Sequence, residues 1–319
     1  MPGAQYRASY AAAEGEGATT ASGERFGVGV AVASTALGGT AAAVTRYLVG
    51  SADPVTLATL RFGIGFLCVL PVALLLRVRW PPRRDRPAVA ALGVAFFAGF
   101  FALYNVAMGH TTAARASLAL ATLPLQTMLV GALLGLERLG TRKALGVAIA
   151  TAGVAAALAS GLASAPPGAW RGELIMAGAV LCMAFYNVWT RPYVRRSSAL
   201  GFLAVGMGAG AAVLVLVGAA SGRLAVLGTF GAREWIAGLY LGAVGGALAF
   251  LLWVVALRHA SPTRAASAMT VSPVTAAMLA AVLMGEPVTP DLVVGLAAVV
   301  AGIWIATTEV GADVAEGGR

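Results

Sequence analysis

Side chains that could bind a ligand lie inside the most apolar stretches of the sequence. They are Tyr104 and Asn105, Thr122 and Gln126, Tyr186 and Asn187, together with Trp189, Trp253, Thr270 and Ser272. A spacing of four residues places Thr122 and Gln126 on one face of a helix. Because an amide or hydroxyl is costly when it faces hydrocarbon, each must meet another helix, water or a bound solute. The chemistry that this set offers is hydrogen bonding and ring stacking.

The sequence lacks the usual catalytic constellations. Its aspartates lie at helix ends or in tails, so no intramembrane aspartyl pair is expected. No GxSxG, HExxH or Walker A pattern occurs, which removes the common serine hydrolase, zinc protease and ATP-driven pump signatures. His110 and His259 have no cysteine or acid cluster beside them, so no metal site is expected. We therefore expect no enzyme and no cofactor, and a driving force that comes from a gradient.

The composition is that of a membrane protein. Of 319 residues, 59% are hydrophobic and 11% are charged, against about 25% charged in an average soluble domain. One large soluble core would need a polar surface that so few charges cannot build. The net charge of +9 comes mainly from arginines in short loops between apolar runs. Membrane topology therefore explains the charge, and a nucleic-acid partner is disfavoured.

The apolar runs predict an all-α membrane protein with ten transmembrane helices, since a helix needs about 20 residues to cross the hydrocarbon layer. The predicted spans are residues 26–47, 54–76, 87–108, 113–137, 142–160, 172–190, 198–219, 233–257, 263–285 and 289–307. Short connections rich in Pro, Gly and charge separate them, so no soluble domain is inserted. The small, polar residues before the first span predict a disordered tail and no cleaved signal peptide.

The distribution of basic residues predicts that both ends of the chain are cytoplasmic. Thirteen Lys and Arg residues lie in the loops that follow even-numbered helices, against five in the loops that follow odd-numbered ones. Basic residues gather on the cytoplasmic side of a membrane. The expected location is the cell membrane, as a multi-pass protein.

The chain reads as a duplicated five-helix unit. A shift of 149 residues aligns 101–137 with 250–286 without a gap and pairs Pro124 with Pro273. Upstream, a shift of 145 pairs the Thr-Arg at 45–46 with that at 190–191. Because five is odd, the second copy must enter the membrane from the opposite side, so inverted repeats are expected. Such repeats suit a transporter that exposes a site at their interface to each side in turn.

Three kinds of motif stand out in the sequence: Leu60-Arg61-Phe62, the mid-helix prolines, and small-residue helices that end in GLERLG at 135–140 and MGEPVT at 284–289. Together they resemble the drug/metabolite transporter superfamily, in its EamA-like branch. The first copy departs from the pattern, with Leu136 before its glutamate where the second has Gly285. The resemblance covers about residues 28–307. It implies a central cavity, lined by helices 1, 3, 4, 6, 8 and 9, through which amino acids, metabolites or drugs are exported.

This resemblance divides the chain into repeats and tails. The predicted parts are a disordered cytoplasmic tail at 1–25, a first EamA-like five-helix repeat at 26–160, a linker at 161–171, a second repeat at 172–307 and a cytoplasmic tail at 308–319.

Each polar position has a structural and a functional interpretation. Proline inside a helix leaves the carbonyl four residues back unpaired, so Pro124 and Pro273 are either hinges or packing kinks. Gln126 and the counterpart cluster at Thr270 and Ser272 either bond neighbouring helices, at about 0.6 kcal/mol per bond, or contact a ligand.

The aromatic and amide side chains also have two interpretations. Tyr104 and Trp253, which the shift of 149 pairs, either enclose an apolar solute or belong to the interfacial aromatic belt. Asn105 and Asn187 are the strongest polar candidates for ligand contact, because an unpaired amide is costly inside a membrane.

Three charged residues complete the candidates. Arg61 lies seven residues past Pro54, about 10 Å into its helix. It either snorkels outward or bonds helix carbonyls or a substrate anion. Glu137 and Glu286 end their helices, where the helix dipole disfavours a carboxylate. We expect both to be structural, with proton coupling as the alternative.

The sequence therefore predicts a secondary transporter that exports small metabolites by alternating access. The substrate classes are amino acids, related neutral, zwitterionic or aromatic compounds, or drugs. The alternative is a lipid-translocating or structural multi-pass membrane protein. The expected partners are a small-molecule substrate and membrane lipid, without nucleic acid, in a monomer or dimer.

Overall fold

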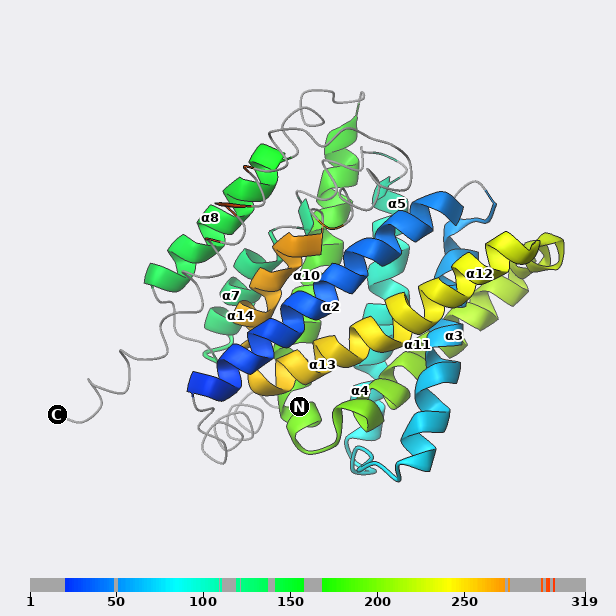
Figure 1. The fold of residues 1–319 in the computed structure, drawn as a ribbon, viewed down its shortest axis with the longest axis horizontal. Coiled ribbons are helices and arrows are strands. Elements are labelled where there is room, and N and C mark those ends of the chain that lie inside the picture. The colour runs from blue at the N-terminus through cyan, green and yellow to red at the C-terminus, as the bar shows by residue number, and fades with distance from the viewer. Residues whose placement is uncertain are drawn as a thin grey trace.

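The computed structural model describes residues 21–48, 51–108, 110, 119–120, 122–136, 141–157, 168–272, 275, 294, 297–298 and 301. All regular structure in these ranges is helical and forms one bundle (Figure 1). The first half contains α2 (Ala21–Leu48), α3 (Pro54–Leu75), α4 (Arg86–Gly93), the π-helix η1 (Val94–Phe100), α5 (Phe101–Met108), α7 (Leu123–Leu133) and α8 (Thr141–Ala157). The second half contains α10 (Ala169–Arg195), α11 (Ala199–Ala220), the 3-10 helix η2 (Arg223–Thr229), α12 (Ala232–Tyr240), the π-helix η3 (Leu241–Leu248), α13 (Ala249–His259), α14 (Pro262–Ser267) and the 3-10 helix η4 (Ala268–Thr270).

Several of these helices are long and apolar enough to cross a membrane. Five such stretches lie within the described residues, at 54–75, 86–104, 170–195, 199–220 and 232–259. They confirm the all-α, multi-pass membrane class. Helices also lie at the first, fourth and fifth predicted spans, and the ninth is described from Pro262 to Ser272. The tenth predicted span and both predicted tails, apart from residues 21–25, lie largely or wholly outside the described residues.

Two helices begin earlier than the predicted spans. α2 begins at Ala21, so residues 21–25 belong to a helix and not to a disordered tail. Glu24, in the first turn, anchors this end because its carboxylate pairs with Arg264. α10 begins at Ala169, three residues before the predicted start, directly after Gly168 turns the chain with φ +78°.

The fourth predicted span is not one continuous helix. α7 begins at Leu123, so Pro124 occupies its first turn and not its middle. Proline is tolerated there because an N–H in the first turn has no helical partner to lose. In the second half, the 3-10 helix η4 lies just before Pro273, which is outside the described residues. The chain thus departs from α-helical geometry before both prolines.

The third and eighth helices each contain a π-helical segment. η1 spans Val94–Phe100 and η3 spans Leu241–Leu248, at nearly the positions that the shift of 149 pairs. At the end of η3, the N–H of Ala249 donates to Gly246 and Val244 and passes over Gly245. The Gly245 carbonyl is therefore released from the bond that an α-helix would give it. π-Segments are frequent at functional sites.

α3 and α11 correspond along their whole length. Both have 22 residues, and their bounds differ by 145. Each is capped by a side chain: the Asp53 carboxylate accepts from the N–H groups of Val55 and Thr56, and the Ser198 hydroxyl accepts from that of Gly201. A side-chain acceptor at this position satisfies backbone donors that the helix itself leaves unpaired. The caps fix the start of the same helix in both halves.

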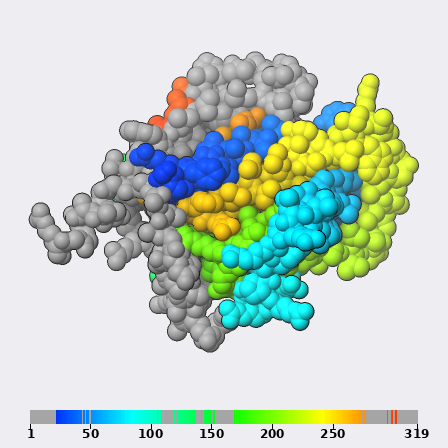
Figure 2. Space-filling model, turned by 60° about the horizontal axis from the view of Figure 1, so that its bottom comes forward, coloured from blue at the N-terminus to red at the C-terminus, as the bar shows by residue number. Residues whose placement is uncertain are grey.

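Contacts between helices give the direction of the chain in each. α2 is antiparallel to α13, because Gly27 packs on Ala260 while Ser34 reaches Ala249. Figures 1 and 2 both show α2 beside the α12–α13 segment. By the same reasoning α3 is antiparallel to α11 and parallel to η3, η1 is parallel to α11, and α10 is antiparallel to α5.

Glycines allow the closest of these approaches. A Cβ at Gly93 would collide with the backbone of Gly206, and one at Gly246 would collide with the carbonyl of Arg61. Small residues let helices in a membrane approach until their backbones touch. The two halves therefore touch through their backbones at these glycines. No flexible side chain is there to move aside for an added methyl group.

We expect Gly93→Ala to destabilise the protein by about 1–3 kcal/mol, because the added methyl overpacks a backbone contact. The measurement is thermal unfolding of the detergent-solubilised protein, followed by tryptophan fluorescence. Gly63→Ala in α3 is the matched control, since its methyl would meet nothing within 4 Å. Equal unfolding temperatures for the two variants would contradict the close packing of α4 on α11.

Candidate functional site

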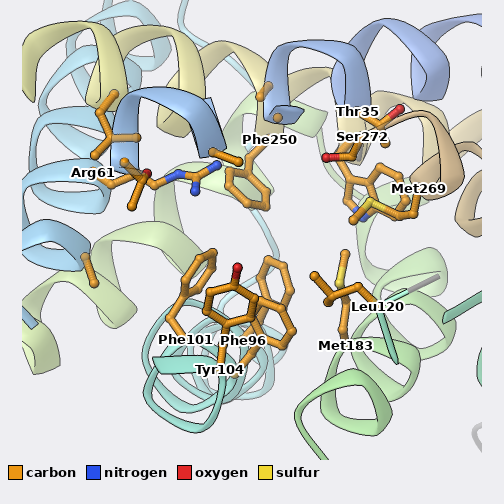
Figure 3. Close-up of a pocket in the computed structure, with 18 of the residues that line it drawn as sticks. Thr35, Arg61, Phe96, Phe101, Tyr104, Leu120, Met183, Phe250, Met269 and Ser272 are labelled. Carbon is orange, nitrogen blue, oxygen red and sulfur yellow. The ribbon is translucent and has the colours of Figure 1, made fainter. Parts of the chain in front are cut away.

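A cavity of about 220 Å³ lies between the two halves of the chain (Figure 3). The first half lines it with Ser34, Thr35, Gly38, Ala42 and Thr45 of α2, Pro54, Leu57, Ala58 and Arg61 of α3, Phe96 and Phe100 of η1, Phe101 and Tyr104 of α5, and Leu120. The second half contributes Met183 of α10, Leu241 of η3, Ala249, Phe250 and Trp253 of α13, Met269 of η4, and Ser272. The walls therefore come from the six helices that the family resemblance implies and also from α3.

Arg61 is the charged residue of the cavity wall. Its Nε and Nη2 donate to the Gly245 carbonyl at 3.2 and 3.0 Å, the carbonyl that the π-helical turn releases. Its guanidinium carbon lies 5.5 Å from the ring centre of Phe101 and 5.6 Å from that of Phe250. The side chain thus bonds a helix carbonyl and faces the interior, and it does not snorkel outward.

Aromatic rings form the wall around this charge. Phe62 packs edge-on against Phe101 and Phe250, with ring centres 4.6 and 5.7 Å apart. Phe96 stacks on Tyr186 at 4.3 Å, so Tyr186 supports the wall from behind. Figure 3 shows the hydroxyl of Tyr104 pointing into the open space. The lining is therefore largely apolar, with a few polar groups that can orient a solute.

Two hydroxyls of α2 tie the cavity to the second half. Ser34 Oγ donates to the Ala249 carbonyl at 2.7 Å, and Thr35 Oγ1 donates to the Ala268 carbonyl at 2.9 Å. Both residues line the cavity. These two bonds therefore join α2 to the second half at the wall of the cavity.

Asn187 lies behind the wall and holds Trp253 in place. Trp253 Nε1 donates to Asn187 Oδ1 at 3.1 Å, and Asn187 is completely buried. Its Nδ2 has no hydrogen-bond partner among the described residues. Trp253 itself lines the cavity. The amide expected to contact a ligand therefore contacts the tryptophan that faces the cavity.

The remaining predicted residues are distributed differently. Tyr104, Trp253 and Ser272 line the cavity, whereas Thr122, Gln126, Thr270, Tyr186, Asn187 and Trp189 do not. Gln126 donates to the Thr122 hydroxyl at 3.2 Å, so these two side chains contact each other and not the cavity. Trp189 stacks on Phe185. Pro273, Glu137, Glu286 and the side chain of Asn105 lie outside the described residues.

The phenylalanine pair Phe101 and Phe250 and the α2 hydroxyls of Ser34 and Thr35 were not predicted from the sequence. Phe101 and Phe250 differ by 149, so the repeat alignment pairs them and could have identified them as cavity residues. Ser34 and Thr35 interrupt an apolar run as Gln126 does, which is the same signal.

Ion pairs join the halves at opposite ends of α2. Near its start, Glu24 Oε2 lies 2.5 Å from Arg264 Nη1, and both side chains are nearly buried. Beyond its other end, Asp53 lies 3.5 Å from Arg223. Burial raises the pKa of Asp53, but hydrogen bonds from Thr56 and backbone N–H groups outweigh it, so the pKa lies below its usual value. Asp53 is therefore ionised at neutral pH and attracts Arg223.

Two segments of the chain match one protein family. The EamA-like transporter family matches residues 25–159 and 170–308. A protein of Streptantibioticus cattleyicolor named "Probable terminal-alkyne amino-acid exporter" is 29% identical over 231 residues, which cover 72% of this chain and 76% of that protein. The "Uncharacterized inner membrane transporter YedA" of Escherichia coli (strain K12) is 30% identical over 251 residues, covering 76% and 78%.

A solved crystal structure has the same fold. It superposes with a TM-score of 0.73 at 22% sequence identity and covers 88% of this chain and 97% of its own. The arrangement of helices around the cavity is thus that of a known fold.

We expect the pair Asn187 and Trp253 to behave as one unit in a double-mutant cycle. Asn187→Ala should cost about 1–3 kcal/mol, because it leaves the indole N–H buried and unpaired. Trp253→Phe should then cost less in the Asn187→Ala background than in the wild type, since the orphaned donor is gone. Thermal unfolding of the four proteins measures the coupling. Strictly additive costs would mean that the hydrogen bond does not contribute.

Proposed function

The chain belongs to the EamA-like transporter family, and on this premise we propose that it is a secondary transporter that exports small metabolites by alternating access. The observation that carries the proposal is the 220 Å³ cavity, whose walls come from both repeats. A site at the interface of two repeats can be exposed to either side by rocking one repeat against the other.

The directions of the helices support inversion of the two repeats. α3 is antiparallel to its counterpart α11. The contacts also make α2 opposite in direction to α10, and η1 opposite to η3. Each described pair thus has the relation that a five-helix duplication requires. The positions of the arginines support cytoplasmic termini in the cell membrane.

The residues that line the cavity support an outward-facing state of the proposed transporter. Thr45 and Pro54, which flank the connection between α2 and α3, line its one end. With cytoplasmic termini, that connection is extracellular. At the cytoplasmic end α2 is held against the second repeat by Glu24 with Arg264 and by Gly27 against Ala260. These contacts are the cytoplasmic closure of the proposed cycle.

The size and lining of the cavity favour an amino-acid-sized solute over a drug. Its volume of about 220 Å³ is below the roughly 300–1,000 Å³ that is usual for sites of drug-sized ligands. The relative from Streptantibioticus cattleyicolor is named "Probable terminal-alkyne amino-acid exporter", and this name supports an amino-acid substrate for the present chain. A lipid-translocating protein would instead expose its polar groove to the bilayer, whereas Arg61 and Tyr104 face an interior space.

Cells that produce the protein should accumulate less of at least one compound in a panel of amino acids and toxic analogues than cells without it. For that compound, Tyr104→Ala should slow efflux roughly tenfold, the effect of losing about 1.4 kcal/mol of cavity contact. Tyr47→Ala is the control, because Tyr47 is 60% exposed on α2 and does not line the cavity. The measurement is efflux from preloaded cells. No export of any compound in the panel would defeat the proposal.

The cytoplasmic closure gives a second expectation. Glu24→Gln should make a cysteine at Ser34 react at least tenfold faster with a thiol reagent added to the cytoplasmic side, because breaking a buried ion pair costs about 3–5 kcal/mol. The assay uses inside-out vesicles and a background in which Cys68 and Cys182 are alanine.

The control for this experiment is an exchange of the two charges. Glu24→Arg combined with Arg264→Glu should return labelling toward the wild-type rate. Asp53→Asn, at the other end of the bundle, should not raise it. A Glu24→Gln variant that reacts at the wild-type rate would show that the pair does not hold the closure.

A further inference from the structure

We propose that Arg61 is the anion site of the cavity and binds a carboxylate of the exported solute, whose apolar part lies against the phenylalanine wall. The substrate class is then a small carboxylic acid that carries an aromatic or aliphatic group. The inference rests on the proposed transport function, since it names the solute that the same cavity takes.

The charge of Arg61 has no anionic partner among the described residues. Asp53, Asp85 and Glu24 each pair with an arginine other than Arg61. A guanidinium has five N–H donors. Nε and Nη2 use two of them on the Gly245 carbonyl. Three donors therefore remain, and Figure 3 shows the guanidinium extending into the cavity.

The surrounding rings stabilise the charge without neutralising it. The guanidinium lies between 5.5 and 5.7 Å from the ring centres of Phe62, Phe101 and Phe250, within the range of a cation–π interaction. Rings cannot accept the forked N–H groups as a carboxylate does. Binding of an anion is therefore favourable at this site, because a partly buried charge without an anion keeps much of its desolvation cost.

The counterpart of Arg61 in the second half is not an arginine. The shift of 145 that relates α3 to α11 pairs Arg61 with Gly206. Gly206 packs against the backbone of Gly93, so the second half has a close helix contact at this position. In contrast, the aromatic neighbours Phe101 and Phe250 are a symmetric pair. A charge has therefore been placed at one of two equivalent positions, on the side that lines the cavity.

The geometry also separates Arg61 from the cavity residues Thr35 and Ser272. In Figure 3, Arg61 lies on one side of the space, while Thr35 and Ser272 lie on the other, beyond Phe250. A carboxylate on Arg61 would thus place its attached apolar group beside the rings of Phe101 and Tyr104. A planar, forked donor also favours a carboxylate over a neutral amide or an amine.

The test is equilibrium binding to purified wild-type protein, so that it does not depend on transport. The probes are 3-phenylpropionate, its neutral carboxamide, phenylalanine and phenethylamine, each titrated by quenching of tryptophan fluorescence. We expect the two carboxylates to bind at least about tenfold more tightly than the amide or the amine, since charge-assisted hydrogen bonds are about twice as strong as neutral ones.

Variants then assign the preference to Arg61. Arg61→Gln should lower 3-phenylpropionate affinity at least about tenfold and leave that of the carboxamide within about twofold. Arg61→Lys should keep part of the preference, because it keeps the charge and loses the fork. Arg83→Gln, which changes an exposed arginine outside the cavity, should behave as the wild type.

The inference fails if wild-type protein binds the carboxamide as tightly as the carboxylate, or binds no probe. It also fails if Arg61→Gln retains the carboxylate preference. These outcomes concern binding only, so they leave an observed efflux activity intact. Conversely, a wild-type protein with the expected binding preference that exports nothing would defeat the transport proposal and retain the anion site.

Discussion

Every polar group inside a membrane-spanning bundle must find its partner within the protein, because hydrocarbon offers none. At the wall of the cavity, side chains of one repeat meet this requirement for backbone carbonyls of the other repeat. The π-helical turn of η3 releases the Gly245 carbonyl, and Arg61 of α3 takes it up. The bond joins the two repeats and turns the guanidinium inward. Ser34 and Thr35 act in the same manner from α2, since each donates to a carbonyl of the second repeat. The contacts that satisfy the helices are thus also those that shape the wall of the cavity.

The sequence predicted the all-α membrane class and the family but not the cavity wall. The length of an apolar run locates a membrane helix, because the thickness of the hydrocarbon layer sets how many apolar residues a helix needs to cross it. Which face of a helix meets which neighbour depends on close packing at glycines such as Gly93 and Gly206, where backbones touch. That rotation decides whether Arg61 snorkels or faces inward. It also decides whether Asn187 meets a ligand or Trp253. Either neighbour can form a hydrogen bond with the amide, so the spacing of residues cannot separate the two alternatives.

The prolines and π-segments likewise depend partly on the local sequence and partly on the tertiary structure. Pro124 marked a break in the fourth span, because a missing N–H is a property of the residue itself. Its place in the first turn of α7 depends on where the preceding residues leave the helix, which no single residue encodes. The π-segments have no sequence signal that we recognised. They recur at nearly equivalent positions in both halves, so repeat alignment can transfer such a feature once it is known in one copy.

α2 connects the proposed cytoplasmic closure to the solute site through one continuous helix. It carries Glu24 near its start, Ser34 and Thr35 in the cavity wall, and Thr45 toward its other end. The partners of Glu24, Ser34 and Thr35 all belong to the second repeat. They lie in its segments 249–259 and 262–270, the eighth and ninth helices. In the proposed cycle, opening the cytoplasmic end would require α2 to leave Arg264, and a helix that moves as a unit would then also strain the bonds from Ser34 and Thr35. A solute that contacts this wall would therefore change the energy of the same motion, which is the coupling that the proposed alternating access needs.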